Sequence, residues 1–149
     1  MNSVNRNLRW AKSWAILVAA LALHVADEAL TGFLPFYNSI ISSLKDTYGW
    51  VPFPTFTFPI WIGGLIAGVV VLFALTPLVL RGYAWLRVVS YFLGILMLAN
   101  AIGHVAMSVW LREPAPGMYS SPVLFVAAVA LLVTTYRSGQ AGGDAGLRS

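Results

Sequence analysis

The stretch SWAILVAALALHVADEALTGF, residues 13–33, decides the fold class of this chain. About 20 apolar residues in a helix cross the hydrocarbon core of a bilayer, and this stretch is long enough. Its only ionisable side chains are those of His24, Asp27 and Glu28. A charged Asp at the centre of a bilayer costs roughly 2.5–3.5 kcal/mol on insertion scales. The stretch therefore predicts a membrane-spanning helix that keeps these groups for chemistry, for ion or proton movement, or for a helix contact.

Three further apolar segments, residues 59–80, 86–111 and 118–136, are also long enough to cross a bilayer as helices. The 149 residues are 59% hydrophobic and only 9% charged, whereas a soluble domain carries about 25% charged residues. We therefore predict an all-α fold, an integral membrane four-helix bundle that occupies residues 1–137. The Gly-rich and polar segment 138–149 is predicted as a disordered tail.

Lysine and arginine residues predict the orientation of this bundle. Seven of them lie next to the chain ends or beside the link between the second and third spans, and two lie on the opposite side. The positive-inside rule places the richer side, and with it both termini, in the cytoplasm. Because the basic residues are few and scattered, the net charge of +4 does not indicate nucleic acid as a partner. The seven are Arg6, Arg9, Lys12, Arg81, Arg87, Arg137 and Arg148, and the two are Lys45 and Arg112.

The outer loop, residues 35–58, is rich in proline and aromatic residues. Aromatic side chains prefer the membrane interface, so the loop is predicted as an interfacial belt, with a lid over an outward-opening pocket as the alternative. Within it, residues 37–47 are compatible with a short amphipathic helix. In the second span, Gly64 and Gly68 have the small-xxx-small spacing that favours close helix packing.

A second polar pair, Asn100 and His104, lies inside the third span. At a helical rise of about 1.5 Å per residue, Asn100 lies about 20 Å beyond Arg87, and His24 lies about 18 Å beyond Lys12. The first and third spans run in the same direction, so the two polar clusters are expected at similar depth in the outer half of the bilayer. Residues four apart share a helix face, and the two stripes therefore predict one pocket between these spans.

The polar groups of this pocket fit three kinds of function. His and carboxylate groups are the usual general acids and bases, and two His with one carboxylate match a zinc or non-haem iron site with open positions. A di-iron site typically uses more carboxylates than these spans hold. The same groups suit ligand binding or proton-linked transport, or a clamp that only holds helices together. The chain has no cysteine for a disulfide, a thiolate ligand or a nucleophile.

These residue types suggest a role for each polar group. His24, Glu28 and His104 are the predicted catalytic residues, and the same three are the predicted ligands of a single zinc or iron ion. A lipid-like or other apolar molecule is the expected ligand, because the pocket lies within the spans. The residues predicted to orient these groups or to bind substrate are Asp27, Asn100, Ser108 and Arg112.

Two blocks of the sequence resemble the HXXEE-domain membrane proteins, a bacterial family named for the pattern His-x-x-Glu-Glu. The first block is His24-Val25-Ala26-Asp27-Glu28, and the second is Asn100-Ala101-Ile102-Gly103-His104, followed by Ser108, Arg112 and Pro116-Gly117. The resemblance runs from the first span to the fourth. It implies a multi-pass protein of the bacterial inner membrane with a site at the polar residues, and it implies no reaction. Asp27 stands in place of the family's first Glu and is one methylene shorter, which weakens the case for a ligand role there.

The favoured interpretation is a small membrane enzyme that acts on a lipid or other apolar substrate by acid–base or metal-assisted chemistry. A ligand-binding or proton-linked transport protein is one alternative, and an accessory subunit with a purely structural polar cluster is another. Residues 15–23 and 88–99, the cytoplasmic halves of the first and third spans, carry few polar side chains. That asymmetry favours an outward-opening pocket over a path through the membrane.

Overall fold

The computed structural model describes residues 3–146, which form six helices and no strand. The predicted all-α fold with four long apolar helices is confirmed. Four helical segments in the described part are long and apolar enough to cross a membrane: Val4–Thr31, Phe58–Arg81, Trp85–Leu111 and Ser121–Gln140. The helices are α1 (Ser3–Thr31), α2 (Phe33–Tyr48), α3 (Phe58–Ala74), α4 (Thr76–Arg81), α5 (Trp85–Leu111) and α6 (Ser121–Gly146).

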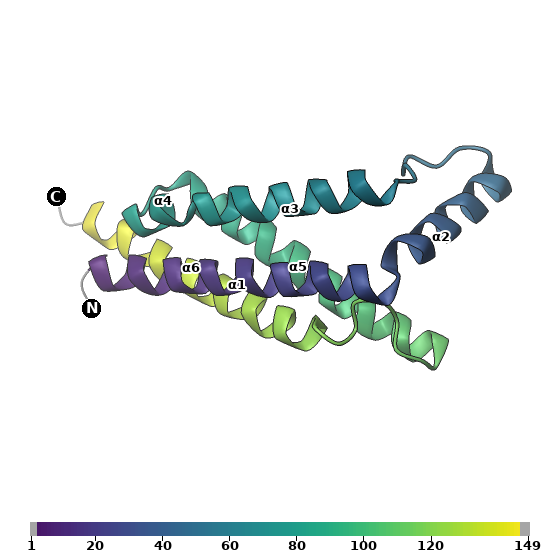
Figure 1. Ribbon diagram of the computed structural model, residues 1–149. Coiled ribbons are helices and arrows are strands. Elements are labelled where there is room, and N and C mark those ends of the chain that lie inside the picture. The colour runs from purple at the N-terminus through teal and green to yellow at the C-terminus, as the bar shows by residue number, and fades with distance from the viewer. Residues whose placement is uncertain (1–2, 147–149) are drawn as a thin grey trace.

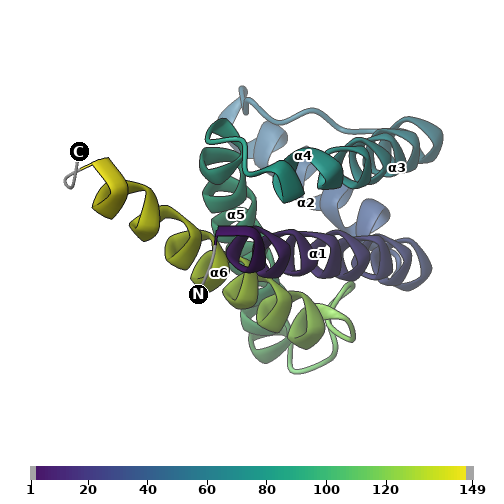
Figure 2. The same cartoon turned by 90° about the vertical axis from the view of Figure 1, so that its left-hand side faces the viewer.

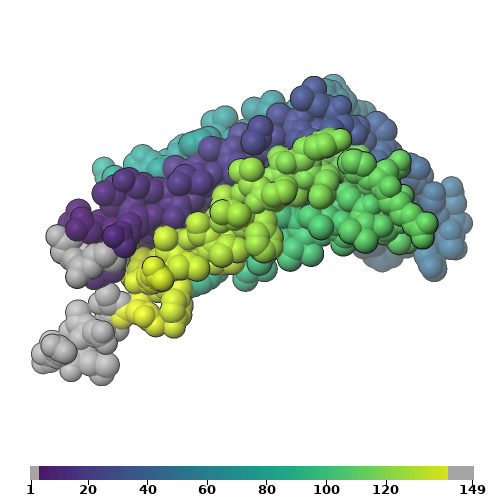
Figure 3. All heavy atoms as spheres, turned by 90° about the horizontal axis from the view of Figure 1, so that it is seen from below, coloured from purple at the N-terminus to yellow at the C-terminus, as the bar shows by residue number. Residues whose placement is uncertain are grey.

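Helices α1 and α6 form the centre of the bundle. Helix α1 packs against α6, α4 and α3, whereas α5 packs mainly against α6. The start of α1 and the end of α6 lie at one end of the molecule, and α2 lies at the other end (Figure 1). Figure 2 shows that α3 and α5 stand apart. On the face seen in Figure 3, α6 covers the space between α1 and α5.

The apolar core fills the half of the bundle nearest the termini. Its largest side chains are those of Trp10 and Trp14, both fully buried. The indole N–H of Trp10 donates to Ser90 Oγ at 3.0 Å, and that of Trp14 donates to the carbonyl of Leu72 at 2.9 Å. These bonds satisfy both buried indole donors. The core also contains Leu17, Val18, Leu86, Leu93, Met97, Leu124 and Leu131.

A glycine in α5, Gly94, marks a close approach of two helices. A Cβ at this position would lie 2.7 Å from Leu132 Cδ2 and 3.6 Å from the carbonyl oxygen of Ala128, both in α6, so the Leu132 side chain would have to shift. The glycines of α3 differ, because a Cβ at Gly64 or Gly68 would meet no described atom within 4 Å. The small-xxx-small spacing of the second span is therefore not used for packing within the described chain.

The boundaries at the site end of α1 differ from the prediction. The first span was predicted to reach Phe33, but α1 ends at Thr31, because Gly32 adopts a left-handed conformation with φ 81° and α2 begins after it. Most of the predicted outer loop, residues 35–58, is also helical in α2. Only residues 49–57 lie outside a helix there.

The link from α2 to α3 is tied back to α2 by a side-chain amide. Asn38 Nδ2 donates to the carbonyl of Phe56 at 2.8 Å, and the N–H of Phe56 donates to Asn38 Oδ1 at 3.1 Å. The hydroxyl of Tyr37 donates to the carbonyl of Pro54 at 3.0 Å. These bonds hold the non-helical residues 49–57 against α2.

The last helix begins later and ends later than predicted. It starts at Ser121 instead of 118, because residues 116–120 form turns around Gly117, whose φ is 82°. The predicted disordered tail was 138–149, but α6 continues to Gly146. A packed helix extends readily, since each added residue gains a hydrogen bond without a new nucleus. Residues 147–149 of the predicted tail lie outside the described residues.

Candidate functional site

Three buried side chains meet between α1 and α5. His24 and Glu28 lie one turn apart on α1, and His104 faces them from α5. Glu28 Oε1 lies 3.5 Å from His24 Nε2 and 3.2 Å from His104 Nε2. One ligand atom from each of the three residues lies within 4.8 Å of the others. The structure thus brings together the three residues predicted as catalytic groups and metal ligands.

The two polar stripes meet in parallel register. His24 Nε2 lies 3.0 Å from Asn100 Oδ1, and Glu28 Oε1 lies 3.2 Å from His104 Nε2. Each pair is separated by 76 residues in the chain, as expected for two helices that run in the same direction. The His24 and His104 rings lie edge to face, with centroids 4.9 Å apart. Asn100 therefore belongs to the wall of the site beside His24.

Asp27 points away from the cluster and binds the start of α6 instead. Its Oδ2 accepts hydrogen bonds from the N–H of Ser120 at 2.8 Å and from the hydroxyl of Ser120 at 2.7 Å. Ser120 Oγ also lies 2.7 Å from His24 Nδ1. A hydroxyl has one hydrogen, and because that hydrogen goes to Asp27, Ser120 accepts from the Nδ1–H of His24. This chain of bonds fixes the His24 ring and turns its Nε2 toward Glu28.

The link between α5 and α6 forms a roof over the cluster. The N–H of Gly117 donates to Thr31 Oγ1 at 3.0 Å, and the N–H of Ala115 donates to Ser108 Oγ at 2.9 Å. A Cβ at Gly117 would lie 2.8 Å from His104 Cε1 and 3.1 Å from Glu28 Cγ. Glycine is therefore required here both for the positive φ and for the close approach.

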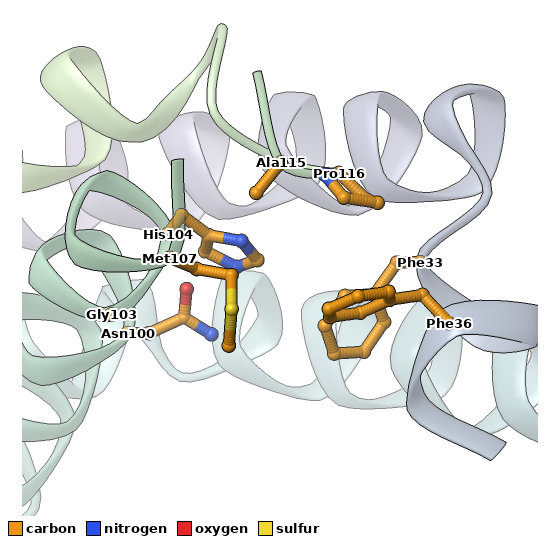
Figure 4. A pocket seen from close by; sticks show the side chains of 8 residues that line it. All are labelled: Phe33, Phe36, Asn100, Gly103, His104, Met107, Ala115 and Pro116. Atoms are coloured by element: carbon orange, nitrogen blue, oxygen red, sulfur yellow. The ribbon is translucent and has the colours of Figure 1, made fainter. Parts of the chain in front are cut away.

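A cavity of about 230 Å³ lies beside the cluster. In Figure 4, Phe33 and Phe36 of α2 face His104 and Asn100 of α5 across the cavity. The Phe33 and His104 rings lie edge to face, with centroids 5.7 Å apart. The lining is apolar apart from Asn100 and His104, and it consists of Phe33, Phe36, Asn100, Gly103, His104, Met107, Ala115 and Pro116.

Comparison with known proteins gives a family for this arrangement. The sequence model of the HXXEE family, described as "protein of unknown function with HXXEE motif", matches residues 15–132. This chain belongs to the HXXEE family. The resemblance seen in the sequence is thereby confirmed. No curated protein and no solved structure matches the chain.

The HXXEE motif of this chain is divided between two tasks. Its first residue, His24, and its last, Glu28, enter the cluster with His104. The position of the first Glu is held by Asp27, which binds Ser120 and so orients His24 from behind. The shorter carboxylate thus anchors the roof of the site.

Two other predicted site residues lie outside the cluster of His24, Glu28 and His104. Ser108 donates to the carbonyl of His104 at 2.8 Å and holds the roof through Ala115, without touching the three central side chains. Arg112 is exposed at the end of α5, where its φ is 59°, and it does not line the cavity. It lies eight positions after His104, about 12 Å along the helix axis.

Sequence reasoning missed Ser120 as a member of the site. It is buried, and it does not line the cavity, so it positions His24 and is not placed to attack a substrate. A signal was present in the sequence, because Ser120-Ser121-Pro122 has the Ser and Pro that typically start a helix. Because α5 ends at Leu111, shortly after His104, the next helix must begin at the same end of the bundle as His104.

Proposed function

We propose that this protein binds one divalent metal ion through His24, Glu28 and His104 and uses it to act on an apolar, membrane-resident substrate. The observation that carries the proposal is the convergence of the three side chains. Two donors on one zinc ion, at bonds of about 2.0–2.1 Å and tetrahedral angles, lie about 3.4 Å apart. The Glu28–His24 and Glu28–His104 separations are 3.5 Å and 3.2 Å, and all three ligand atoms lie within 4.8 Å of one another, so the two His rings would draw closer around an ion.

The hydrogen bonds around His24 support a metal ligand. Metal-binding His residues donate their second ring N–H to a neighbouring oxygen, which fixes the tautomer, and Ser120 takes that bond from His24. The Nε2 lone pair of a neutral His24 then faces two acceptor oxygens, Asn100 Oδ1 at 3.0 Å and Glu28 Oε1 at 3.5 Å. A cation between these groups removes the repulsion. A proton on Nε2 does the same, and it gives the acid–base version of the site.

The ligand set defines the chemistry that such an ion supplies. An ion held by two His and one carboxylate would keep coordination positions open, and it would supply polarisation of a substrate oxygen or activation of water. Of the three proposed ligands, His104 lines the cavity, whereas His24 and Glu28 lie behind it and are buried. The apolar lining suits a substrate with a single polar group on a hydrocarbon body.

Transport through the bundle is a weaker account of the same residues. The core on the terminal side of the cluster is closed by apolar side chains, including those of Trp14, Leu17 and Met97. The described contacts thus support a pocket at one end of the bundle. Metal content distinguishes the enzyme from the structural clamp, because hydrogen bonds that only hold helices together need no ion.

Elemental analysis of the purified protein tests the proposal. We expect about one zinc or iron ion per chain, as a three-ligand site would hold. Glu28→Gln and His104→Ala should each lower the metal content at least about tenfold, because each removes a ligand. Glu113→Gln is the control, since Glu113 is exposed and outside the cluster. Folded protein without metal would contradict the metal site and leave acid–base chemistry or the clamp.

We also propose a multi-pass protein of the bacterial inner membrane, with both termini in the cytoplasm and the site in the outer half. The distribution of lysine and arginine supports this orientation, and the start of α1 and the end of α6 lie together at the end of the bundle opposite α2 (Figure 1). The chain has no cysteine, so single cysteines report topology. In intact cells, Thr47→Cys should react with an impermeant maleimide and Gln140→Cys should not. The reverse labelling would overturn the orientation.

A further inference from the structure

Gly103 of α5 is the one exposed residue among the described residues that line the cavity, and we take its position as the mouth. Gly103 lines the cavity and is exposed, and a Cβ built on it would meet no described atom within 4 Å. Its neighbours on the same helix, Ala99, Ile102 and Ala106, are exposed and apolar. A larger side chain at this position would therefore enter open space at the edge of the cavity without disturbing the packing of α5 on α6.

This mouth faces the side of the bundle. Gly103 lies eight residues before Leu111, about 12 Å along the axis, within the segment that is long and apolar enough to cross a membrane. The end of the bundle is closed above it, because the roof at Ala115 and Gly117 is bonded to Ser108 and Thr31. A ligand that reaches His104 past Gly103 comes from the hydrocarbon.

The opposite wall of the cavity contains Phe33 and Phe36, and further aromatic rings support Phe33 from behind. Phe33 lies against His104, and its ring stacks at 6.1 Å on Tyr37 and at 6.1 Å on Trp61. Tyr37 is held in turn by its bond to Pro54. Helices α2 and α3 thus present a supported surface, and the small residue Gly103 stands across from it.

The volume limits what enters. A cavity of about 150 Å³ holds a benzene molecule, and sites that enclose a drug-sized ligand measure about 300–1,000 Å³. At about 230 Å³, this cavity encloses the end of a lipid and not the whole molecule. The polar atoms of Asn100 and His104 line it, so the polar end of the ligand is the part that they would bond.

We infer that the site takes the polar end of a single-chain amphiphile, such as a fatty alcohol or a related oxygen-bearing lipid, which enters sideways past Gly103 while its tail stays in the bilayer. The inference rests on the proposed function for what happens to the bound end. Entry itself depends only on the cavity and its mouth, so the two are tested by different measurements.

Photolabelling of the full-length protein in phosphatidylcholine vesicles tests the entry. The probe is a straight-chain fatty alcohol with a diazirine next to its hydroxyl end, and the labelled residues are mapped by mass spectrometry. We expect label on Phe33, Phe36 or Met107. Gly103→Leu should reduce it by about tenfold, since a filled cavity cannot accept the polar end of the alcohol, and Gly103→Ala should reduce it less. Gly64→Leu, at an exposed helix glycine outside the cavity, is the matched control and should label as the unaltered protein does.

Two results would overturn the inference. One is equal labelling of the unaltered protein and Gly103→Leu, and the other is label confined to the separate outer groove lined by Val109 and Tyr119. Metal content is measured on the same samples and should not change in Gly103→Leu. Label that depends on Gly103 in a protein without metal would support the entry and contradict the proposed metal chemistry. Bound metal without label that depends on Gly103 would support the proposed metal site and contradict entry past Gly103.

Discussion

Gly117→Ala is expected to destabilise the protein by about 2–5 kcal/mol, the sum of backbone strain and overpacking. The strain arises because the φ of Gly117 is 82°, a conformation that side chains disfavour. The overpacking arises because the new methyl would lie 2.8 Å from His104 Cε1 and 3.1 Å from Glu28 Cγ. The His104 ring cannot move away without leaving Glu28, so the metal content should fall as well.

Gly32→Ala separates the two causes of this loss. Gly32 has a nearly equal φ of 81°, and a Cβ there would meet no described atom within 4 Å. It should lose only the strain, about 1–2 kcal/mol, and keep its metal. The measurements are the free energy of unfolding in mixed micelles and elemental analysis for both variants. If both variants lose the same free energy of unfolding and both keep the metal, the close contact between Gly117 and His104 does not contribute to stability.

Ser120→Ala is expected to lower metal affinity by about 10–100-fold, the usual effect of losing an outer partner of a ligating His. His24 Nδ1 would lose its bonding partner, and Asp27 would lose one of its two bonds to Ser120. A buried polar group without a partner costs about 1–3 kcal/mol, so the free energy of unfolding should fall by this amount. Zinc titration against a competing chelator measures the affinity.

The neighbouring serine provides the matched control for Ser120→Ala. Ser121 is also buried, and its hydroxyl donates to the carbonyl of Gly117 at 2.8 Å, with no bond to His24. Ser121→Ala should cost about 0.5–1.5 kcal/mol of stability and leave metal affinity unchanged. Ser120→Thr retains a hydroxyl and should recover part of the affinity. Equal metal affinity in Ser120→Ala and Ser121→Ala would show that the bond to His24 does not position it.

The meeting of the two polar stripes was accessible from the sequence. Counting residues from basic anchors placed His24 and Asn100 at similar depth, and these two side chains lie 3.0 Å apart. The count works because helical rise is constant and because two spans separated by one other span run in the same direction. Glu28 and His104, four residues further along each helix, meet for the same reason.

The roof of the site could not be predicted from the sequence in this way. The Ser120 hydroxyl and the backbone of Gly117 reach the cluster from turns, where no periodicity tells which residue faces inward. Helix α2 was anticipated only as an option over residues 37–47, because its prolines and aromatic residues also suit a loop at the membrane interface. The cavity wall that Phe33 and Phe36 form therefore could not be predicted from the sequence.

The long separation of bonded partners has a consequence for biogenesis. His24, Asp27 and Glu28 bond to side chains that follow them in the chain by 76–96 residues. The ribosome delivers α1 first, so in the proposed membrane bundle its polar face would enter without these partners, at a cost of roughly 2.5–3.5 kcal/mol for a charged group at the bilayer centre. In the proposed membrane bundle, helix α1 alone would be a costly insertion, and the arrival of α5 and the start of α6 would remove that cost. Assembly of the site would thus offset the cost of inserting its first helix.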